Sequence, residues 1–292
     1  MAFKILSQKH EQLAEIVAQY MSEATLKRTL RTKKALEMAE TITMSVIGGA
    51  SVPPGIHPEC CLVGQVSPGS NAFRWYCSGV LIHPQAVLTA AHCLNSQKGQ
   101  SPNVVALNTV SLNNSDMVNA DIIRILRPPV IHPFYNSSIK IHDIAVLILR
   151  NPSIVAPVQR ATHFETINAN SVTVVGFGNT NPTGTLNFGK KRTINIPIHL
   201  LRRNPGENFN QTENSFGFES DVEFVAGGNG VDACLGDSGG PAYLDASGVK
   251  KVMGLVSRKV RNAVNECGNG GIYTRADVHE SFIDDVLSAN NL

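Results

Sequence analysis

The chain has 292 residues, and its 25 Lys and Arg residues nearly balance its 23 Asp and Glu residues, which leaves a net charge of +2. Beyond residue 45 the two kinds of charge are equal in number, so this part lacks the basic surface that nucleic-acid-binding proteins require. No apolar run approaches the ~20 residues of a membrane-spanning helix, and the first residues lack the apolar core of a secretory signal.

Residues 1–45 form the first predicted element. Apolar side chains recur there at helical spacing between Leu13 and Leu30, and the stretch contains neither Pro nor Gly. We therefore expect an N-terminal helical extension that is distinct from the rest of the chain.

The remainder changes character at Gly48 and Pro53. Short runs of apolar and β-branched residues then alternate with turn-forming residues, a pattern typical of all-β proteins. The clearest runs are 79–91, 121–131, 143–152, 171–178, 192–200 and 249–257. A last helix is expected at 277–289. Its apolar face consists of Val278, Phe282, Val286 and Leu287.

Three short segments carry residues suited to nucleophilic catalysis: LTAAHC with His92, HDIAVLIL with Asp143, and GDSGGP with Ser238. Serine needs a base to remove its proton, and that base needs a third group to orient it. Taken singly, each segment also fits a structural histidine, a turn aspartate or a tight turn. Their order along the chain, with separations of 51 and 95 residues, favours a serine hydrolase.

From residue 46 to the C-terminus, the sequence resembles the chymotrypsin/trypsin family of serine proteases. The matching segments are VIGG (46–49), CSGVLI (77–82), LTAAHC (88–93), HPFYN (132–136), DIAVLIL (143–149), VVGFGNT (174–180), DACLGDSGGP (232–241), GLVS (254–257) and GIYTR (271–275). The resemblance implies an all-β domain over 46–292, built of two antiparallel six-stranded β-barrels and the C-terminal helix. Barrel one would span about 46–160 and barrel two about 161–276, with the active site between them.

The resemblance also implies a catalytic mechanism. Ser238 would attack the scissile carbonyl, His92 would accept its proton, and Asp143 would orient the imidazole. The backbone N–H groups of Gly236 and Ser238 would form the oxyanion hole. This mechanism needs no metal and no organic cofactor. Only two aspartates lie between His92 and Asp143, too few for a calcium-binding loop.

The six cysteines include no CxxC pair that would indicate zinc. The resemblance implies two disulfides, Cys77–Cys93 and Cys234–Cys267. Such bridges indicate an extracellular or periplasmic location, although the sequence has no recognisable signal peptide. Cys60 and Cys61 have no counterpart in the family pattern. Two buried free thiols are the simplest interpretation, and an intermolecular link is the alternative.

Members of this family are commonly cut just before a segment like VIGG. Here Val46 would become the new N-terminus, and its amino group would pair with Asp237 beside the nucleophile, because a buried carboxylate needs a cationic partner. Residues 1–45 would then be a removable pro-segment, and a permanent helical appendage is the alternative. Ser45 precedes the cut, so an enzyme that cleaves after basic residues would need either another protease for activation or several steps that begin in the basic stretch at Lys27–Lys34.

Asp232 stands six positions before the catalytic serine, where trypsin-like members place an aspartate at the floor of the specificity pocket. This favours cleavage after Arg or Lys. Ser257, Lys259 and Gly271 would line the same pocket. The family usually has an aromatic residue and a glycine where Arg258 and Lys259 stand, so one wall is rebuilt. Lys259 either points outward or reaches Asp232 and neutralises it.

The sequence thus predicts a serine endopeptidase that acts on proteins or peptides, with an activating protease and protein inhibitors as further partners. One alternative is a narrow-specificity processing protease with a different pocket preference. A non-catalytic binding protein on the same fold is disfavoured because all three catalytic residues are present. GDSGG also fits the nucleophile elbow of α/β-hydrolases, but Gly239, Gly240 and Pro241 oppose the helix that must follow.

Overall fold

A computed structural model describes residues 49–67, 73–94, 99–181, 183–204 and 207–292. The predicted helical leader and the predicted new N-terminus at Val46 lie outside these residues.

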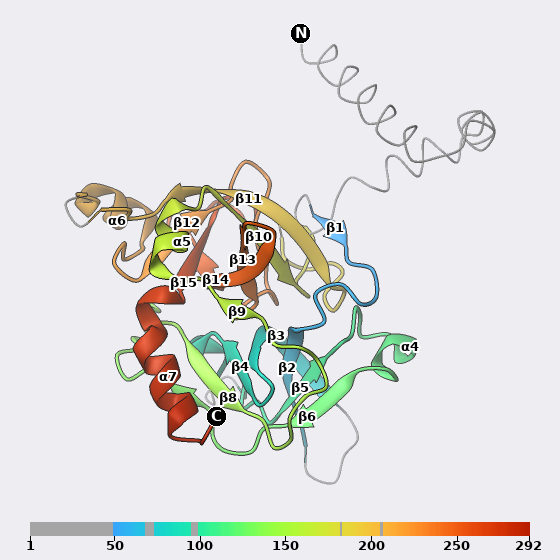
Figure 1. Ribbon diagram of the computed structural model, residues 1–292. Coiled ribbons are helices and arrows are strands. Elements are labelled where there is room, and N and C mark those ends of the chain that lie inside the picture. The colour runs from blue at the N-terminus through green and yellow to red at the C-terminus, as the bar shows by residue number, and fades with distance from the viewer. Residues whose placement is uncertain (1–48, 68–72, 95–98, 182, 205–206) are drawn as a thin grey trace, which may run out of the picture. The chain divides into compact units, whose positions relative to one another are not determined.

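Strands from the first half of the described chain form one sheet, seen in blue to green in Figure 1. Its order is β6-β5-β2-β3-β4-β8-β7, and every pairing within it is antiparallel. The strands are β2 (Cys60–Val66), β3 (Phe73–His83), β4 (Ala86–Thr89), β5 (Val104–Leu107), β6 (Asp121–Arg124), β7 (Val130–Ile131) and β8 (Ala145–Ile148). A bridge between Ile125 and Leu149 joins the ends of β6 and β8, so six of these strands close on themselves.

The second half supplies most of the other sheet, seen in yellow to red in Figure 1; a short strand from the start of the described chain, drawn in blue, also belongs to it. Its strands are β1 (Ala50–Ser51), β9 (Gln159–Arg160), β10 (Ser171–Gly176), β11 (Arg192–Leu200), β12 (Glu223–Ala226), β13 (Pro241–Ala246), β14 (Val249–Lys259) and β15 (Gly271–Arg275). The pairing of β11 with β12 closes the ring β11-β10-β13-β14-β15-β12. The predicted pair of six-stranded antiparallel barrels is therefore confirmed.

Two short strands lie outside this ring. β1 pairs with β11, and β9 pairs with β14 in the parallel direction. Both precede the rest of their sheet in sequence, so the chain contacts the second barrel before and after it builds the first.

Alternating side chains explain why these segments become strands. In β11, Ile194 and Ile196 are buried inside the barrel while Asn195 and Pro197 are exposed on its outer face. This two-residue period is that of a sheet with one face against the core. The six runs identified in the sequence all contain strands.

An apolar cluster joins the two barrels and fixes their relative position. Leu62, Val80 and Leu88 enter it from the first barrel, and Val175, Phe177 and Leu255 enter it from the second. All six side chains are fully buried. The loops at this junction are consequently held by packing from both sides, which is what a site assembled from both barrels needs.

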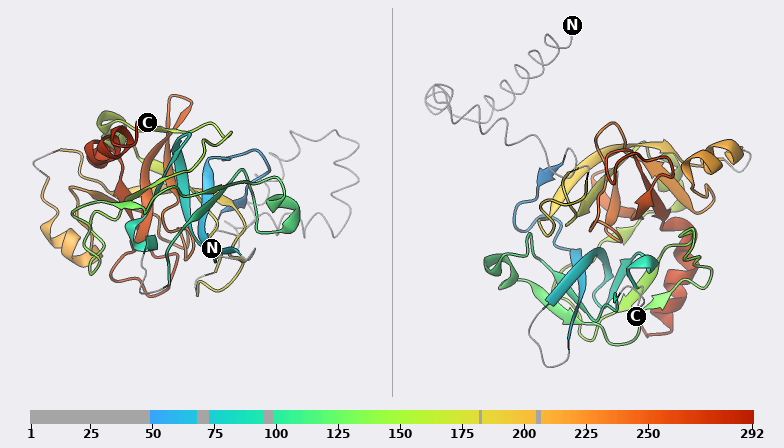
Figure 2. Two further views of the ribbon diagram at one scale, coloured as in Figure 1. Left: turned by 90° about the horizontal axis from the view of Figure 1, so that it is seen from below. Right: turned by 180° about the vertical axis from the view of Figure 1, so that it is seen from behind.

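The remaining described elements are short helices. They are η1 (Ala91–Leu94), α4 (Asn114–Met117), α5 (His163–Asn168), α6 (Asn210–Phe216), η3 (Asp277–His279) and α7 (Glu280–Ser288). Figure 2 shows that α7 lies beside the first barrel although it ends the chain. None of the described helices is long and apolar enough to cross a membrane.

The C-terminal helix is present where the sequence predicts it, but its apolar face differs. Ile283 and Val286 are buried, whereas Val278 is 40% exposed. The first three residues form the 3₁₀ turn η3, which has three residues per turn instead of 3.6. This turn rotates Val278 away from the face on which Val286 lies.

Cys60 and Cys61 are free thiols, as the simplest interpretation proposed, and both are fully buried in β2. Adjacent strand residues point to opposite faces. Cys60 accordingly packs in the cluster between the barrels, and Cys61 packs inside the first barrel.

Candidate active site

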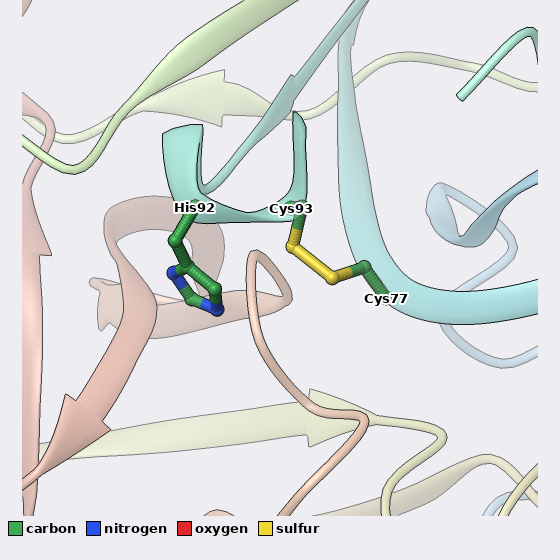
Figure 3. A group of neighbouring side chains, drawn as sticks. All are labelled: Cys77, His92 and Cys93. Atoms are coloured by element: carbon green, nitrogen blue, oxygen red, sulfur yellow. A yellow bond between two sulfur atoms is a disulfide. The ribbon is translucent and has the colours of Figure 1, made fainter. Parts of the chain in front are cut away.

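His92 lies in η1, directly after strand β4 of the first barrel. The next residue, Cys93, forms a disulfide with Cys77 of β3, and Figure 3 shows this bridge beside the His92 ring. The predicted bridge between Cys234 and Cys267 is also present. The first disulfide therefore ties the backbone of the turn that carries His92 to the neighbouring strand.

The carboxylate of Asp143 is fully buried and makes three hydrogen bonds. It accepts the backbone N–H of His92 at 2.8 Å, and its second oxygen lies 2.7 Å from His92 Nδ1. The hydroxyl of Ser257, on β14 of the second barrel, donates to it at 2.6 Å. Because a carboxylate only accepts, Nδ1 carries the proton, and His92 Nε2 keeps a free lone pair.

These contacts also determine the charge of Asp143. Burial is the largest single influence and raises its pKa, but the His92 ring and the hydrogen bonds from His92 and Ser257 together outweigh burial. The pKa of Asp143 therefore lies below its ordinary value, and the group is an anion at neutral pH.

Ser238 lies in a tight turn that both barrels hold. The backbone N–H of Ser78, in β3, donates to the Ser238 carbonyl at 2.9 Å, and the Ser78 hydroxyl donates to the Gly236 carbonyl at 2.9 Å. On the other side, the N–H of Gly239 donates to the Val256 carbonyl at 2.8 Å. The turn therefore lies at the barrel junction, next to the loops that bear His92 and Asp143.

Glycine is required within this turn. Gly236 has φ +100°, and a Cβ there would lie 2.6 Å from the ring of Phe188. Gly239 has φ +77°, and a Cβ there would lie 2.2 Å from the hydroxyl of Thr89. These left-handed conformations and close approaches explain the glycines of GDSGG.

His92, Gly236 and Ser238 line one cavity of about 450 Å³, together with Asp232. Within the described residues, neither the Ser238 hydroxyl nor the N–H groups of Gly236 and Ser238 donate to another protein group. The cavity thus brings together a hydroxyl, an imidazole and two candidate donors for a developing negative charge. Contacts between such groups often tighten only when substrate is bound.

Asp237, next to the serine, is fully buried. Its carboxylate accepts the N–H of Gly178 at 2.7 Å and that of Cys234 at 2.8 Å. Burial nevertheless raises its pKa to about 6, and the Coulombic effect of Arg192 offsets only part of this. A full cationic partner would relieve the remaining cost.

Asp232 lies at the buried end of the cavity, where it is 1% exposed. It accepts the N–H groups of Ala233 at 2.8 Å and Gly270 at 2.9 Å. Burial raises its pKa to about 7. Gly271, also predicted for this pocket, lines the cavity, and a Cβ there would lie 2.9 Å from the Asp232 carboxylate.

The Lys259 ammonium does not contact Asp232, although both residues line the cavity. The ammonium pairs with Glu266 at 2.8 Å, and both side chains are largely exposed. Of the two arrangements left open by the sequence, the one in which Lys259 reaches Asp232 and neutralises it is therefore not the one that the structure has. The described residues place no cationic group against the Asp232 carboxylate.

The two residues before Lys259 make contacts that the sequence did not predict. Ser257 lines the cavity, but its hydroxyl is committed to Asp143. Arg258 forms a two-pronged contact with the buried Glu223, at 2.5 and 2.9 Å, and donates to the carbonyls of Lys140 and Gly217. Arg258 is thus a structural cation that the sequence analysis treated only as a departure from the family pattern.

Comparison with known proteins agrees with this geometry. The sequence model of the family described as Trypsin matches residues 46–283. The chain belongs to the trypsin family. The two disulfides and the membership of the trypsin family together indicate a secreted or extracellular protein.

Individual relatives of the trypsin family are distant. The chain is 29% identical to the serine protease Hayan of Drosophila melanogaster, over 86% of this chain and 40% of that protein. It is 28% identical to a trypsin of Saccharopolyspora erythraea, over 84% of this chain and 99% of that one. It is 27% identical to chymotrypsin-like elastase family member 1 of Felis catus, over 84% of this chain and 90% of that protein.

Among the residues that the structure describes, two groups of side chains near the site have spacings that suit a metal ion. One comprises His92 with Cys77 and Cys93, but both sulfurs belong to the disulfide drawn in Figure 3 and cannot act as thiolates. The other comprises His132, His142 and His279, beside the segment that bears Asp143. Burial lowers the pKa of all three imidazoles, to about 4 for His132 and His279.

Arg258 and Lys259 are adjacent, but only Arg258 forms a buried ion pair, and this difference can be tested by substitution. We expect Arg258→Met to lower the free energy of unfolding by about 3–5 kcal/mol, because it leaves the Glu223 carboxylate buried without its partner. Lys259→Met removes only an exposed pair and should change it by less than about 1 kcal/mol. Urea denaturation of both variants measures the difference, and equal effects would contradict this description of the wall.

Proposed function

We propose that this member of the trypsin family is a serine endopeptidase in which His92, Asp143 and Ser238 form the catalytic triad. The observation that carries the proposal is the 2.7 Å contact between His92 Nδ1 and the buried Asp143 carboxylate, at the edge of the cavity that Ser238 also lines. This contact leaves Nε2 as the only basic nitrogen of the ring and turns the imidazole into an oriented base.

The proposed reaction has two halves. The Ser238 oxygen attacks the peptide carbonyl while its proton passes to His92 Nε2, and the carbonyl oxygen becomes an anion that the N–H groups of Gly236 and Ser238 stabilise. When the C–N bond breaks, the imidazolium returns the proton to the leaving amine, and an acyl-enzyme remains. Water then repeats the sequence and releases the carboxylic acid.

Each triad residue has a distinct expected effect. Ser238→Ala should abolish practical turnover of peptide substrates. Asp143→Asn should lower kcat by roughly 10⁴, because the amide no longer stabilises the cationic ring. Steady-state kinetics with a peptide series measure both effects, and circular dichroism checks that each variant is folded. Near-normal turnover by Ser238→Ala would overturn the proposal.

We further propose that the enzyme cleaves after Arg or Lys. Asp232 supports this because its carboxylate is buried in the cavity and accepts hydrogen bonds from uncharged groups, namely two backbone N–H groups and, at 3.5 Å, the hydroxyl of Tyr273. A long cationic substrate side chain would supply the missing counter-charge. Lys259 also supports this preference, because its ammonium pairs with Glu266 and not with the Asp232 carboxylate. A processing protease with another preference remains the alternative, because Arg258 and Lys259 alter one wall.

The pKa of Asp232 gives this specificity a pH signature. A cation binds the ionised carboxylate, so affinity is lost as pH falls below about 7 and the carboxyl group takes up a proton. We expect benzamidine to bind about 100-fold more weakly at pH 5 than at pH 8, as measured by calorimetry. The isosteric variant Asp232→Asn should bind it weakly at both pH values. A flat profile in the unaltered protein, or strong preference for Phe substrates, would contradict the assignment.

Activation by cleavage before Val46 is the last part of the proposal. The buried Asp237 supports it, since burial raises the pKa of this carboxyl group and a new amino terminus would supply the opposite charge. Residues 1–45 would act as a pro-segment, and Ser45 would require an activating protease of different specificity. The trypsin family acts on protein substrates, so we expect proteins or peptides as substrates of this chain, and protein inhibitors as further partners.

A further inference from the structure

We propose that His132, His142 and His279 form a zinc site whose occupation shifts Asp143 and lowers peptidase activity. The three rings come from separate parts of the chain: the segment after β7, the residue before Asp143, and η3. Each ring offers a nitrogen, and the three nitrogens lie within 4.8 Å of one another. Imidazole is a preferred ligand of Zn²⁺.

The best-defined ligand is His279, which is 2% exposed. Its Nδ1 lies 2.6 Å from the Arg275 carbonyl oxygen, which can only accept, so Nδ1 carries the proton. Nε2 therefore has a lone pair, and it faces His142 Nδ1 at 3.0 Å. A ring nitrogen fixed by a backbone carbonyl on its far side is the usual arrangement of a metal-binding histidine.

The spacing suits a metal with little movement. Two imidazole nitrogens bound to one tetrahedral Zn²⁺ at about 2.0–2.1 Å stand roughly 3.3 Å apart. The nitrogens of His279 and His142 need to separate by only a few tenths of an ångström, while His142 moves its proton from Nδ1 to Nε2. Water can fill a fourth position, as at zinc sites with three protein ligands.

His132 completes the group. Its ring stacks on that of His142, with centroids 4.7 Å apart, and meets His279 edge-on at 4.9 Å. Its Nδ1 accepts the N–H of Phe134 at 3.3 Å, a long contact that binding through either nitrogen would replace. Ring packing alone does not require nitrogen at all three positions, and Phe282 shows that a phenyl ring also packs here.

The site is coupled to Asp143 through the backbone. His142 precedes Asp143 and has φ +54°, a left-handed conformation that few non-glycine residues adopt. Its carbonyl accepts the N–H of Ile144 at 2.8 Å, and the N–H of His132 donates to the Ile144 carbonyl at 3.1 Å. A displacement of the His142 ring therefore acts on both sides of Asp143, whose carboxylate contacts require distances near 2.7 Å.

Zinc binding is tested on the full chain without a polyhistidine tag, by calorimetry and by metal analysis after dialysis against ZnCl₂. We expect one zinc ion per chain. His132→Phe keeps a ring in the stack but removes its nitrogens, and His279→Gln removes the best-defined ligand. Each should weaken binding at least tenfold. Binding that survives both substitutions would overturn the proposal.

Two matched controls exclude other histidines. His199→Ala alters an exposed histidine on β11 and should leave zinc affinity unchanged. His92→Ala should do the same, and loss of binding in this variant alone would place the metal at the catalytic histidine and overturn the proposal.

The inhibitory part rests on the proposed peptidase function, whereas binding does not. We expect saturating Zn²⁺ to lower kcat at least fivefold in the unaltered enzyme, and the ratio of rates with and without zinc to approach one in His132→Phe. Zinc binding at the cluster without any change in kcat would refute the coupling to Asp143. Failure of the peptidase function would leave the binding result intact, so the two failures are distinguishable.

Discussion

The arrangement of the site depends on one buried anion, the carboxylate of Asp143. It receives hydrogen bonds from His92 of the first barrel and from Ser257 of the second, so it can be satisfied only when the two barrels are packed together. The apolar cluster between the barrels supplies that packing, and Ile144, the residue after Asp143, belongs to it. Burying an unpaired carboxylate would cost several kcal/mol, so the fold and the orientation of the His92 imidazole are energetically linked.

Two further carboxylates, Asp232 and Asp237, lie near the same turn with less compensation than Asp143. Each accepts two backbone N–H groups, yet burial raises the pKa to about 7 and about 6 respectively. Because burial disfavours the charged form of both carboxylates, a cation brought close to either of them would stabilise it. In the proposed function a substrate side chain serves Asp232, and the amino group of Val46 serves Asp237.

Much of the fold and of the site was predictable, because it depends on local patterns. Alternating β-branched residues identify the strands, and the motifs around His92, Asp143 and Ser238 identify segments that the structure brings together between the barrels. Other features depend on residues that are not adjacent in sequence. Lys259 pairs with Glu266 in a loop, and Arg258 pairs with Glu223 on another strand, and neither pairing can be read from the local sequence. The 3₁₀ turn before α7 likewise displaced Val278 from the predicted face. Helix α5 was not predicted, although the capping box formed by Thr162 and Glu165 is a sequence signal for the start of a helix.

The most direct test of the central claim, that Ser238 is an activated nucleophile, is labelling with a serine-directed phosphonate followed by mass spectrometry and N-terminal sequencing. The account predicts one adduct per chain on Ser238, its loss in Ser238→Ala, its strong reduction in His92→Ala, and an N-terminus at Val46 in the labelled species. Absence of labelling in a folded protein that begins at Val46, or an adduct on another serine, would contradict it. Full labelling with Met1 still attached would contradict the activation step alone.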